Sequence, residues 1–229
     1  TADFEDYITD QFPFRDSWLD VKSRAERLSG KTENNGVFFG RDDALISRFE
    51  EPAEKSILSG IAAVNALGEN TGLPVVFALI PSAAEVWRDK LPAGANTADQ
   101  AALIRRIYGE VDAGTVDMLS ALEAHAAEDI YYRTDHHWTT LGAYYGYAAT
   151  AEALGLTPQP MDRFQPVTVS ESFYGTVYSS SGVRWVKPDR MERWAPDTGV
   201  TLTRYDSPEG TVSPVYDAKK LETKDKYGY

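Results

Sequence analysis

The sequence predicts an α/β fold, a three-layer parallel sheet with a small β-rich appendage after residue 160. Helix and strand patterns alternate between residues 57 and 154, as expected when helices cover both faces of a parallel sheet. The clearest strand, Pro74-Val-Val-Phe-Ala-Leu-Ile80, is apolar throughout, which is typical of a strand buried on both faces. Of the 229 residues, 42% are hydrophobic and 25% are charged, a composition that indicates a globular protein.

A helix and a hairpin come first in the chain. The helix is amphipathic, because its apolar residues recur at spacings of three and four: Trp18, Val21, Ala25 and Leu28. Gly30 ends it. Two apolar runs, 37–40 and 44–46, lie on either side of Arg41-Asp42-Asp43, and this order predicts a β-hairpin.

The alternating helices and strands follow the hairpin. One helix ends before Gly72 and carries its apolar residues on one face: Ile57, Leu58, Ile61, Val64 and Leu67. A capping-box pattern at 97–100 opens the next helix. The remaining predicted elements are, in chain order, a strand at 115–118, a helix at 119–127, a strand at 130–132 and a helix at 140–154.

Two segments are expected along the chain. Residues 1–160 form the α/β core, with the N-terminal helix and hairpin, and residues 161–229 form a β-rich segment of the same domain. The second segment holds short β-prone runs separated by glycine or proline: 167–169, 176–178, 183–186 and 201–203. Residues 217–229 are almost wholly polar and end without a strand or helix, which predicts that the chain is cut from a longer one.

Charge and residue counts exclude several functions. The net charge is −12, with 23 Lys and Arg against 35 Asp and Glu, so nucleic acid and anionic membrane surfaces would be repelled. Without cysteine there is no thiol nucleophile, disulfide or Cys-ligated metal. We expect no cofactor. The N-terminus is acidic and polar, so no signal peptide is predicted. The longest apolar run, 75–80, is too short for a membrane helix. That leaves a cytosolic protein or a trimmed ectodomain.

The segment 131–139 carries the strongest sign of chemistry. It holds two of the three histidines, at the junction of a predicted strand and a helix, where α/β sheets bind ligands. Residues two apart in an extended stretch project to the same side. Asp135 can therefore accept a hydrogen bond from one ring nitrogen of His137 and leave the other as a general base. His136 is expected to point the other way, with Arg133 and Trp138 beside the site.

Other interpretations of these residues stay open. In the structural one, Asp135 caps the following helix and His137 is buried. A zinc site at Asp135, His136 and His137 is disfavoured, because adjacent residues seldom converge on one ion, so no metal is expected. Ser82, at the end of the strand 74–80, is a candidate substrate contact or a helix N-cap. The tyrosine pairs and clusters at 131–132 and 144–147 are expected to pack in the core rather than bind sugars.

Thr134-Asp-His-His-Trp-Thr139 resembles the signature of the bacterial DHHW family and the Asp-x-His-Trp motif of the alginate O-acetyltransferases. Five further blocks occur in the order which that family shows: Asp10-Gln-Phe-Pro-Phe-Arg15, Asn35-Gly-Val-Phe-Phe-Gly40, Lys90-Leu-Pro92, Phe173-Tyr-Gly-Thr176 and Lys224-Asp-Lys-Tyr227. The resemblance implies an SGNH-hydrolase-like fold with circularly permuted element order. It also implies an extracytoplasmic protein, membrane-anchored or secreted, with a membrane tether expected upstream.

The resemblance also implies roles for the site residues. Asp135 and His137 become the orienting acid and the general base of a Ser-His-Asp triad. The substrate-binding candidates follow from their place in the sequence and not from the resemblance: Arg133, His136, Trp138 and Ser82. The family's serine lies in a block of the form Gly/Asp-Asp/Thr-Ser-Tyr, which does not follow Lys224–Tyr227 in this sequence. The serines at 179–181 resemble that block only loosely and are expected to form a turn.

Three functions are therefore considered. The first is an O-acyl (acetyl) transferase or esterase-type domain that acts on cell-envelope polysaccharide, inactive by itself without the serine block. Its partners would be that polysaccharide and an acyl donor, for which a membrane acyltransferase is one source. The second is a non-catalytic envelope binding or scaffolding module that keeps the fold. The third is a metal-dependent hydrolase.

Overall fold

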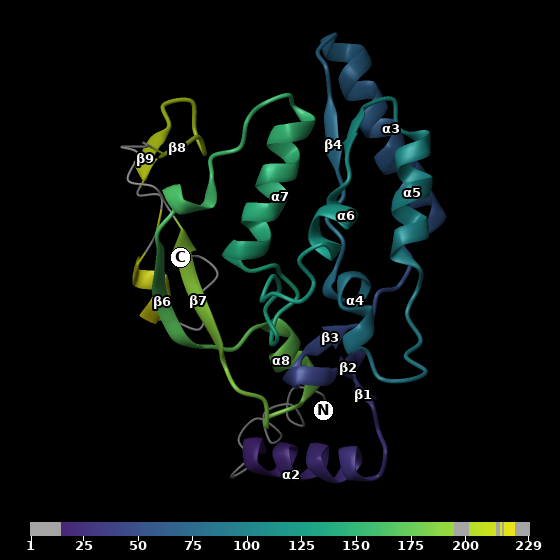
Figure 1. Cartoon of the computed structure of the whole chain (residues 1–229), viewed down its shortest axis with the longest axis vertical. Helices are drawn as coiled ribbons and strands as arrows, with labels where there is room; N and C mark the ends of the chain where they lie inside the picture. Colours follow the sequence, from purple (N-terminus) through teal and green to yellow (C-terminus); the bar gives the residue numbers. More distant parts are fainter. Residues whose placement is uncertain (1–14, 195–201, 214–215, 217, 223–229) are drawn as a thin grey trace. The chain divides into compact units, whose positions relative to one another are not determined.

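The computed structural model describes residues 15–194, 202–213, 216 and 218–222. The predicted motif residues 10–14 and 224–227 lie outside these ranges. The chain divides into two compact units (Figure 1), one made of Thr1–Pro158 and Tyr174–Pro188, the other of Gln159–Phe173 and Asp189–Tyr229. Each unit is described by itself.

The first unit contains helices and strands in alternation, as predicted for an α/β fold, although not every predicted element forms. They are α2 (Arg15–Leu28), β1 (Glu33–Asn34), β2 (Val37–Phe39), β3 (Leu45–Ser47), α3 (Glu54–Thr71), β4 (Val76–Ala78), α4 (Ala83–Val86), α5 (Gln100–Glu110), β5 (Gly114–Val116), α6 (Met118–Glu123), α7 (Thr140–Ala153) and α8 (Thr176–Ser181). Gly30 and Gly72, both at positive φ, follow α2 and α3, so the predicted glycine stops are confirmed.

The predicted hairpin is the pair β2–β3, which is antiparallel with Phe38 opposite Ile46. β1 adds a third strand through a tight turn at Asn35 and Gly36, both at positive φ, as a two-residue hairpin turn requires. The side-chain amide of Asn35 donates to the carbonyl of Ser180, 2.8 Å away. The small sheet thereby holds the end of α8.

The parallel sheet is smaller than predicted. β4 pairs in parallel with β5, Val76 lying opposite Gly114, and no other strand joins them among the described residues. Figure 1 shows α3 and α5 on one side of this pair and α7 on the other. β4 is half-buried and Ile80 is 50% exposed, so this strand is not buried on both faces as its apolar sequence predicts. The α/β content is present, and a three-layer parallel sheet is not confirmed.

The third predicted strand, 130–132, is reduced to one antiparallel bridge between Tyr131 and Trp138. Ile130 and Tyr131 are nevertheless buried in the main core. The other large side chains that are fully buried in this core come from the hairpin, from the residue after α4, and from α6: Phe38, Ile46, Trp87 and Leu122. The apolar run at 130–132 therefore reflects core packing rather than a strand.

Two smaller clusters complete the first unit. Ile57, Ile61 and Leu103 join α3 to α5, whereas Leu58 and Leu67 of the predicted apolar face are exposed. The other cluster packs β2 and β3 against α8 and the residues that follow it: Val37, Leu45, Val177, Val183 and Val186. This second cluster fixes the start of α8, which forms part of the site.

The helix α2 forms as predicted, but its predicted apolar face is not its packing face. Trp18, Val21 and Leu28 are exposed, while Ser23 is buried and Arg27 stacks over the ring of Trp185 at 5.2 Å. Spacing alone indicated the helix and not the side that it buries. No helix among the described residues is long and apolar enough to cross a bilayer.

The second unit is β-rich. β6 (Pro166–Phe173) pairs antiparallel with β7 (Asp189–Trp194), and β8 (Leu202–Arg204) pairs antiparallel with β9 (Thr211–Ser213). Two of the predicted runs do not form strands and belong to the first unit: 176–178 lies in the helix α8, and 183–186 is a loop. Their valines are buried against the hairpin, so β-prone composition there serves core packing.

Candidate active site

The site is a short loop, residues 132–137, held between the core and α7. The bridge between Tyr131 and Trp138 closes it, and Thr139 donates its backbone N–H to the carbonyl of Ile130 at 2.9 Å. The hydroxyl of Thr139 accepts from the N–H of Gly142 and caps α7. The capping residue is thus Thr139 and not Asp135, so the carboxylate of Asp135 is available for another role.

The loop is anchored at the carboxyl end of β4, where α/β sheets place their ligand sites. Tyr131 donates its hydroxyl to the carbonyl of Pro81, 2.6 Å away and three residues beyond β4. Leu45 of the hairpin donates its N–H to the carbonyl of Arg133 at 2.7 Å. Sheet and hairpin together therefore fix the loop.

The start of α8 docks directly onto the loop. Thr134 is fully buried and accepts from two backbone donors, the N–H of Gly175 at its hydroxyl (3.1 Å) and the N–H of Tyr178 at its carbonyl (2.9 Å). A β-carbon at Gly175 would lie 2.4 Å from Oδ2 of Asp135, so only glycine allows this approach. Both Gly175 and Thr176 belong to the family block Phe173-Tyr-Gly-Thr176, and Thr176 also begins a β-prone run, but the sequence predicts no role in the site for either residue.

The carboxylate of Asp135 is buried, and both of its oxygens accept hydrogen bonds from described residues. Oδ1 accepts from the backbone N–H of His137 at 2.9 Å and lies 2.6 Å from its Nδ1. Oδ2 accepts from the backbone N–H and the hydroxyl of Thr176, at 2.8 and 2.9 Å. Burial alone would raise the pKa of Asp135, but these hydrogen bonds outweigh it and hold that pKa below its usual value.

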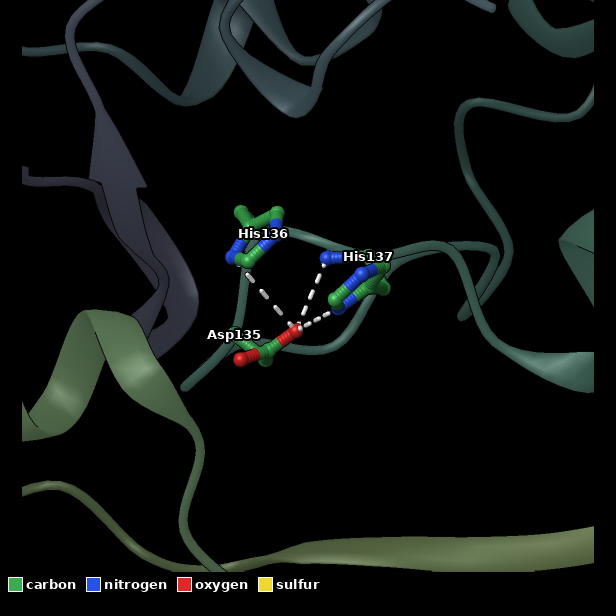
Figure 2. A group of neighbouring side chains, drawn as sticks. All are labelled: Asp135, His136 and His137. Carbon is green, nitrogen blue, oxygen red and sulfur yellow. Dashed lines mark hydrogen bonds and ion pairs between the residues drawn. The ribbon is translucent and has the colours of Figure 1, made fainter. Parts of the chain in front are cut away.

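The predicted pairing of Asp135 with His137 is present in the structure (Figure 2). The distance of 2.6 Å between Nδ1 and Oδ1 is that of a strong, charge-assisted hydrogen bond. The side chain of His137 is 53% exposed, so it does not have the burial that a purely structural histidine would show. Its role as a general base stays a prediction.

His136 does not turn away from the pair, contrary to expectation. Its ring centroid lies 3.9 Å from that of His137, at an interplanar angle of 36°, and both side chains gather around Asp135 in Figure 2. Residues 133–137 form a series of bends and not an extended strand. The two-residue alternation of a strand therefore does not apply there.

These three side chains are also a possible donor set for a metal ion, with one ligand atom from each within 4.8 Å of the others. A carboxylate has about four lone-pair positions, and on Asp135 four protein donors use them. A metal would have to displace at least one of these bonds. The donor set therefore fits a hydrogen-bonded network better than a zinc centre.

Comparison with known proteins decides the family. The model of the SGNH hydrolase-like domain of acetyltransferase AlgX matches residues 34–210, well over half of the chain. The chain belongs to this family. No curated protein matches it.

Several solved structures resemble this SGNH hydrolase-like domain. A DHHW family protein from Eubacterium siraeum is 24% identical with a TM-score of 0.66, over 82% of this chain and 66% of that one. The O-acetyltransferase domain of Pseudomonas putida AlgJ is 23% identical with a TM-score of 0.54, over 70% and 64%. Bacillus cereus PatB1 with a sulfonyl adduct is 19% identical with a TM-score of 0.55, over 77% and 63%.

These likenesses show a shared fold. The chain spans slightly less than two thirds of the length of each of these structures.

Two predicted substrate contacts of the SGNH-like domain have clear structural partners. Arg133 donates from Nη2 to the carbonyl of Pro188 at 3.0 Å, which ties the loop to the segment after α8. Trp138 packs against the main core and against α7, where β-carbons at Gly142 and Gly146 would lie 3.0 and 2.6 Å from it. The glycines of α7 thus provide the space for this indole.

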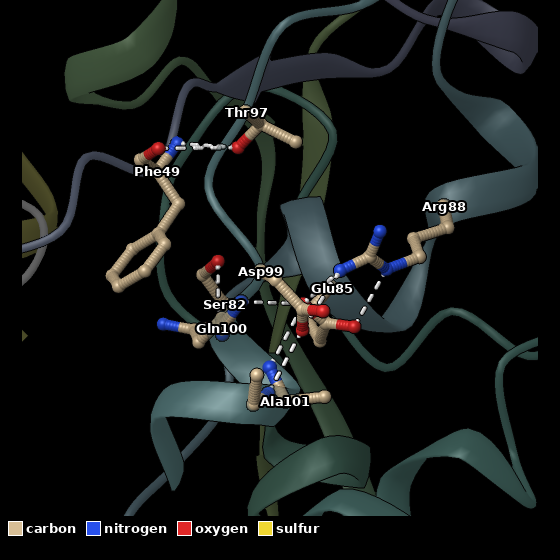
Figure 3. Close-up of polar contacts among 9 residues, drawn as sticks. Phe49, Ser82, Glu85, Arg88, Thr97, Asp99, Gln100 and Ala101 are labelled. Atoms are coloured by element: carbon tan, nitrogen blue, oxygen red, sulfur yellow. Dashed lines mark hydrogen bonds and ion pairs between the residues drawn. The ribbon is translucent and has the colours of Figure 1, made fainter.

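Ser82 belongs to a second polar network (Figure 3). Its hydroxyl and its backbone N–H both donate to Oε1 of Gln100, at 3.0 and 2.7 Å. Ser82 precedes α4 as its N-cap but makes no side-chain cap bond there. The network centres on Glu85, a buried carboxylate that pairs with Arg88 and accepts the N–H groups of Gln100 and Ala101. Ser82 therefore helps to join α4 to α5.

The serines at 179–181 lie in α8 and not in a turn. Their hydroxyls donate to backbone carbonyls three or four residues earlier, at 3.1, 3.2 and 3.0 Å respectively. This is the ordinary pattern of helical serines. It gives no indication that one of them is a nucleophile.

Proposed function

We propose that this chain provides the Asp–His pair of a Ser-His-Asp triad and that it serves in O-acyl transfer, specifically O-acetyl transfer. The observation that carries the proposal is the 2.6 Å hydrogen bond between Nδ1 of a half-exposed His137 and a buried Asp135. Its setting, at the carboxyl end of β4 in an SGNH hydrolase-like domain, supports the same conclusion.

The proposed mechanism uses the two nitrogens of His137 differently. With Nδ1–H donated to Asp135, Nε2 carries the lone pair of a general base. As a serine hydroxyl attacks the acyl carbonyl, Nε2 takes its proton, and the ionised Asp135 stabilises the imidazolium. The proton then passes to the departing alcohol. In the second step, Nε2 removes the proton of an acceptor hydroxyl as its oxygen attacks the acyl-serine carbonyl. The serine–acyl bond then breaks, and the imidazolium returns the proton to the serine oxygen.

The serine is the part that this chain does not identify. The family resemblance assigns it to a block that does not follow Lys224–Tyr227 in the sequence, and the helical serines of α8 donate to backbone carbonyls. The activity is therefore proposed for a protein in which such a block is present. The sulfonyl adduct of the similar PatB1 structure supports covalent chemistry on this fold, because such adducts form when a nucleophile attacks a sulfonyl reagent.

The proposed acceptor is a cell-envelope polysaccharide, and the proposed location is extracytoplasmic with a membrane tether upstream. The resemblance of the motif at 134–139 to that of the alginate O-acetyltransferases supports this choice. The net charge of −12 makes nucleic acid an unfavourable alternative. Among the predicted substrate contacts, His136 is favoured because its side chain is 53% exposed beside His137. Arg133, Trp138 and Ser82 make the packing and hydrogen-bond contacts described above.

The test is hydrolysis of nitrophenyl acetate by the full-length protein and by its His137→Gln variant. We expect the rate of hydrolysis to fall by several orders of magnitude in His137→Gln, as it does when the base of a triad is removed. His125→Gln is a matched control, because Nδ1 of His125 also lies 2.6 Å from a carboxylate oxygen, that of Glu128. Activity equal to that of the wild type in His137→Gln contradicts the proposal. An inactive full-length protein that retains envelope glycans favours the binding module.

A further inference from the structure

We propose that Thr176 is a positioning residue that connects His136 to Asp135 and holds His136 in the tautomer protonated at Nδ1. The site then presents two imidazoles whose Nε2 atoms are acceptors, and not one. The inference deepens the proposed function, because Nε2 of His136 would accept a hydrogen bond from a hydroxyl of the substrate. Only this role in substrate binding rests on the proposed function.

The positions of three atoms determine where the protons lie. The hydroxyl oxygen of Thr176 lies 2.9 Å from Oδ2 of Asp135 and 2.9 Å from Nδ1 of His136. A hydroxyl has one proton to donate, and an ionised carboxylate can only accept. The proton of Thr176 is therefore directed to Asp135. Toward His136 the hydroxyl has only a lone pair, so Nδ1 of His136 must be the donor.

The ionisation of Asp135 is the condition for this assignment. The carboxylate accepts two backbone N–H groups, from His137 and Thr176, besides the side-chain bonds. A protonated carboxyl group would place its own proton against one of these donors. Although burial opposes ionisation, the hydrogen bonds keep the pKa of Asp135 below its usual value, so the group is charged at neutral pH.

One carboxylate thus orients two histidines. It holds His137 directly, through Nδ1 and Oδ1 at 2.6 Å, and His136 through the hydroxyl of Thr176. A neutral imidazole carries one ring proton, and the partner of one nitrogen decides the state of the other. Both rings then have their lone pair on Nε2. With centroids 3.9 Å apart, the pair suits a substrate with more than one hydroxyl group.

The positioning role of the Thr176 hydroxyl can be tested separately from the packing of its side chain. The N–H of Thr176 also donates to Oδ2 of Asp135, at 2.8 Å, and this bond does not need the side chain. Thr176→Val keeps the β-branched shape and the backbone bond, and it removes only the hydroxyl. Thr176→Ser restores a hydroxyl in a smaller side chain. The two variants therefore separate the hydrogen bond from the fold.

The experiment is a long-range ¹H–¹⁵N correlation spectrum of the ¹⁵N-labelled chain, recorded at a pH where the imidazoles are neutral. Such spectra distinguish a protonated Nδ1 from a protonated Nε2, and the chain has three histidines; a His136→Gln variant identifies the signals of His136. We expect His136 and His137 both to carry their proton on Nδ1. Thr176→Val should move the proton of His136 toward Nε2 and leave His137 unchanged, and Thr176→Ser should match the wild type.

Thr150→Val is the control, because Thr150 donates its hydroxyl to the carbonyl of Gly146 within α7, and this loss should leave His136 unchanged. A wild-type His136 protonated at Nε2 overturns the inference, and so does a Thr176→Val spectrum identical to the wild type. If Thr176→Val does not fold, the wild-type tautomer alone decides. None of these spectra requires turnover or a serine nucleophile, so failure of the acetyltransferase proposal gives a different result from failure of this one.

Discussion

Gly175 lies so close to Asp135 that a β-carbon at residue 175 would stand 2.3 Å from the β-carbon of Asp135 and 2.4 Å from Oδ2. The φ angle of Gly175 is −88°, which any residue can adopt. The glycine is therefore required by the close approach of the chain to the carboxylate, and not by its backbone conformation.

Gly175→Ala should consequently destabilise the protein. We expect a loss of about 1–3 kcal/mol, the usual effect of forcing additional atoms into a packed site. Urea unfolding followed by tryptophan fluorescence measures it. In a double-mutant cycle with Asp135→Gly, which removes the β-carbon, the two effects should not add. Additive effects contradict the assignment of the clash to Asp135.

Asp135→Asn should lower stability at neutral pH by about 1–3 kcal/mol, because an amide cannot accept all the buried donors that the carboxylate accepts. The loss should depend on pH. The folded pKa of Asp135 is lowered, since its hydrogen bonds outweigh the opposing effect of burial. Stability from such a group is present above its unfolded pKa of about 3.9 and is lost as pH falls through the folded pKa.

The difference in unfolding free energy between wild type and Asp135→Asn should therefore narrow as pH falls below about 4. Urea titrations of both proteins at a series of pH values measure this. Other carboxylates titrate in both proteins and cancel in the difference. A difference that stays constant or widens on acidification rejects the hydrogen-bond assignment at Asp135.

Glu85→Gln tests the network that joins α4 to α5. Glu85 is buried and accepts from Arg88 at 2.6 and 2.7 Å and from two backbone N–H groups. We expect the free energy of unfolding to fall by about 1–3 kcal/mol, because the amide of glutamine leaves some of these donors without an acceptor. Glu54→Gln is the control, since the exposed pair of Glu54 with Arg106 should contribute little. Equal effects of the two substitutions in thermal unfolding contradict the prediction.

Gly146→Ala tests the packing of Trp138 on α7. Alanine in a helix interior normally stabilises by up to about 1 kcal/mol relative to glycine. At residue 146 a β-carbon would lie 2.6 Å from the indole ring of Trp138, so the sign should reverse. Gly109→Ala in α5, where the β-carbon meets nothing within 4 Å, should stabilise. A stabilising Gly146→Ala, measured by thermal unfolding, shows that the indole moves freely.

The sequence predicted the local elements well where a local cause exists. Glycines at positive φ ended α2 and α3, and the run at 37–47 formed a hairpin, because turn conformations depend on a few neighbouring residues. The pairing of Asp135 with His137 was also predictable, since two residues so close in the chain can meet in several conformations.

How these elements pair and pack depends on contacts between distant parts of the chain. The apolar strand at 74–80 forms only Val76–Ala78 with one partner, because a sheet depends on strands that come from elsewhere in the chain. Val177 was read as part of a strand and instead packs from a helix against the hairpin. Apolar composition indicates that a residue is buried, but it does not indicate whether that residue lies in a helix, a strand or a loop.

The candidate active site likewise combines features that the sequence predicts with features that depend on the folded structure. Asp135, His136 and His137 could be identified from the sequence as the chemical groups of the site, because a family motif surrounds them. That His136 stays beside His137, that Thr176 from α8 bonds to both His136 and Asp135, and that Gly175 admits this contact were decided by folding. Thr176 is 40 residues from His136 and 41 from Asp135 along the chain, so hydrogen bonds between them form only once the core has brought α8 against the loop. His136 and His137 are adjacent, and the bends of the folded loop set the direction of their rings.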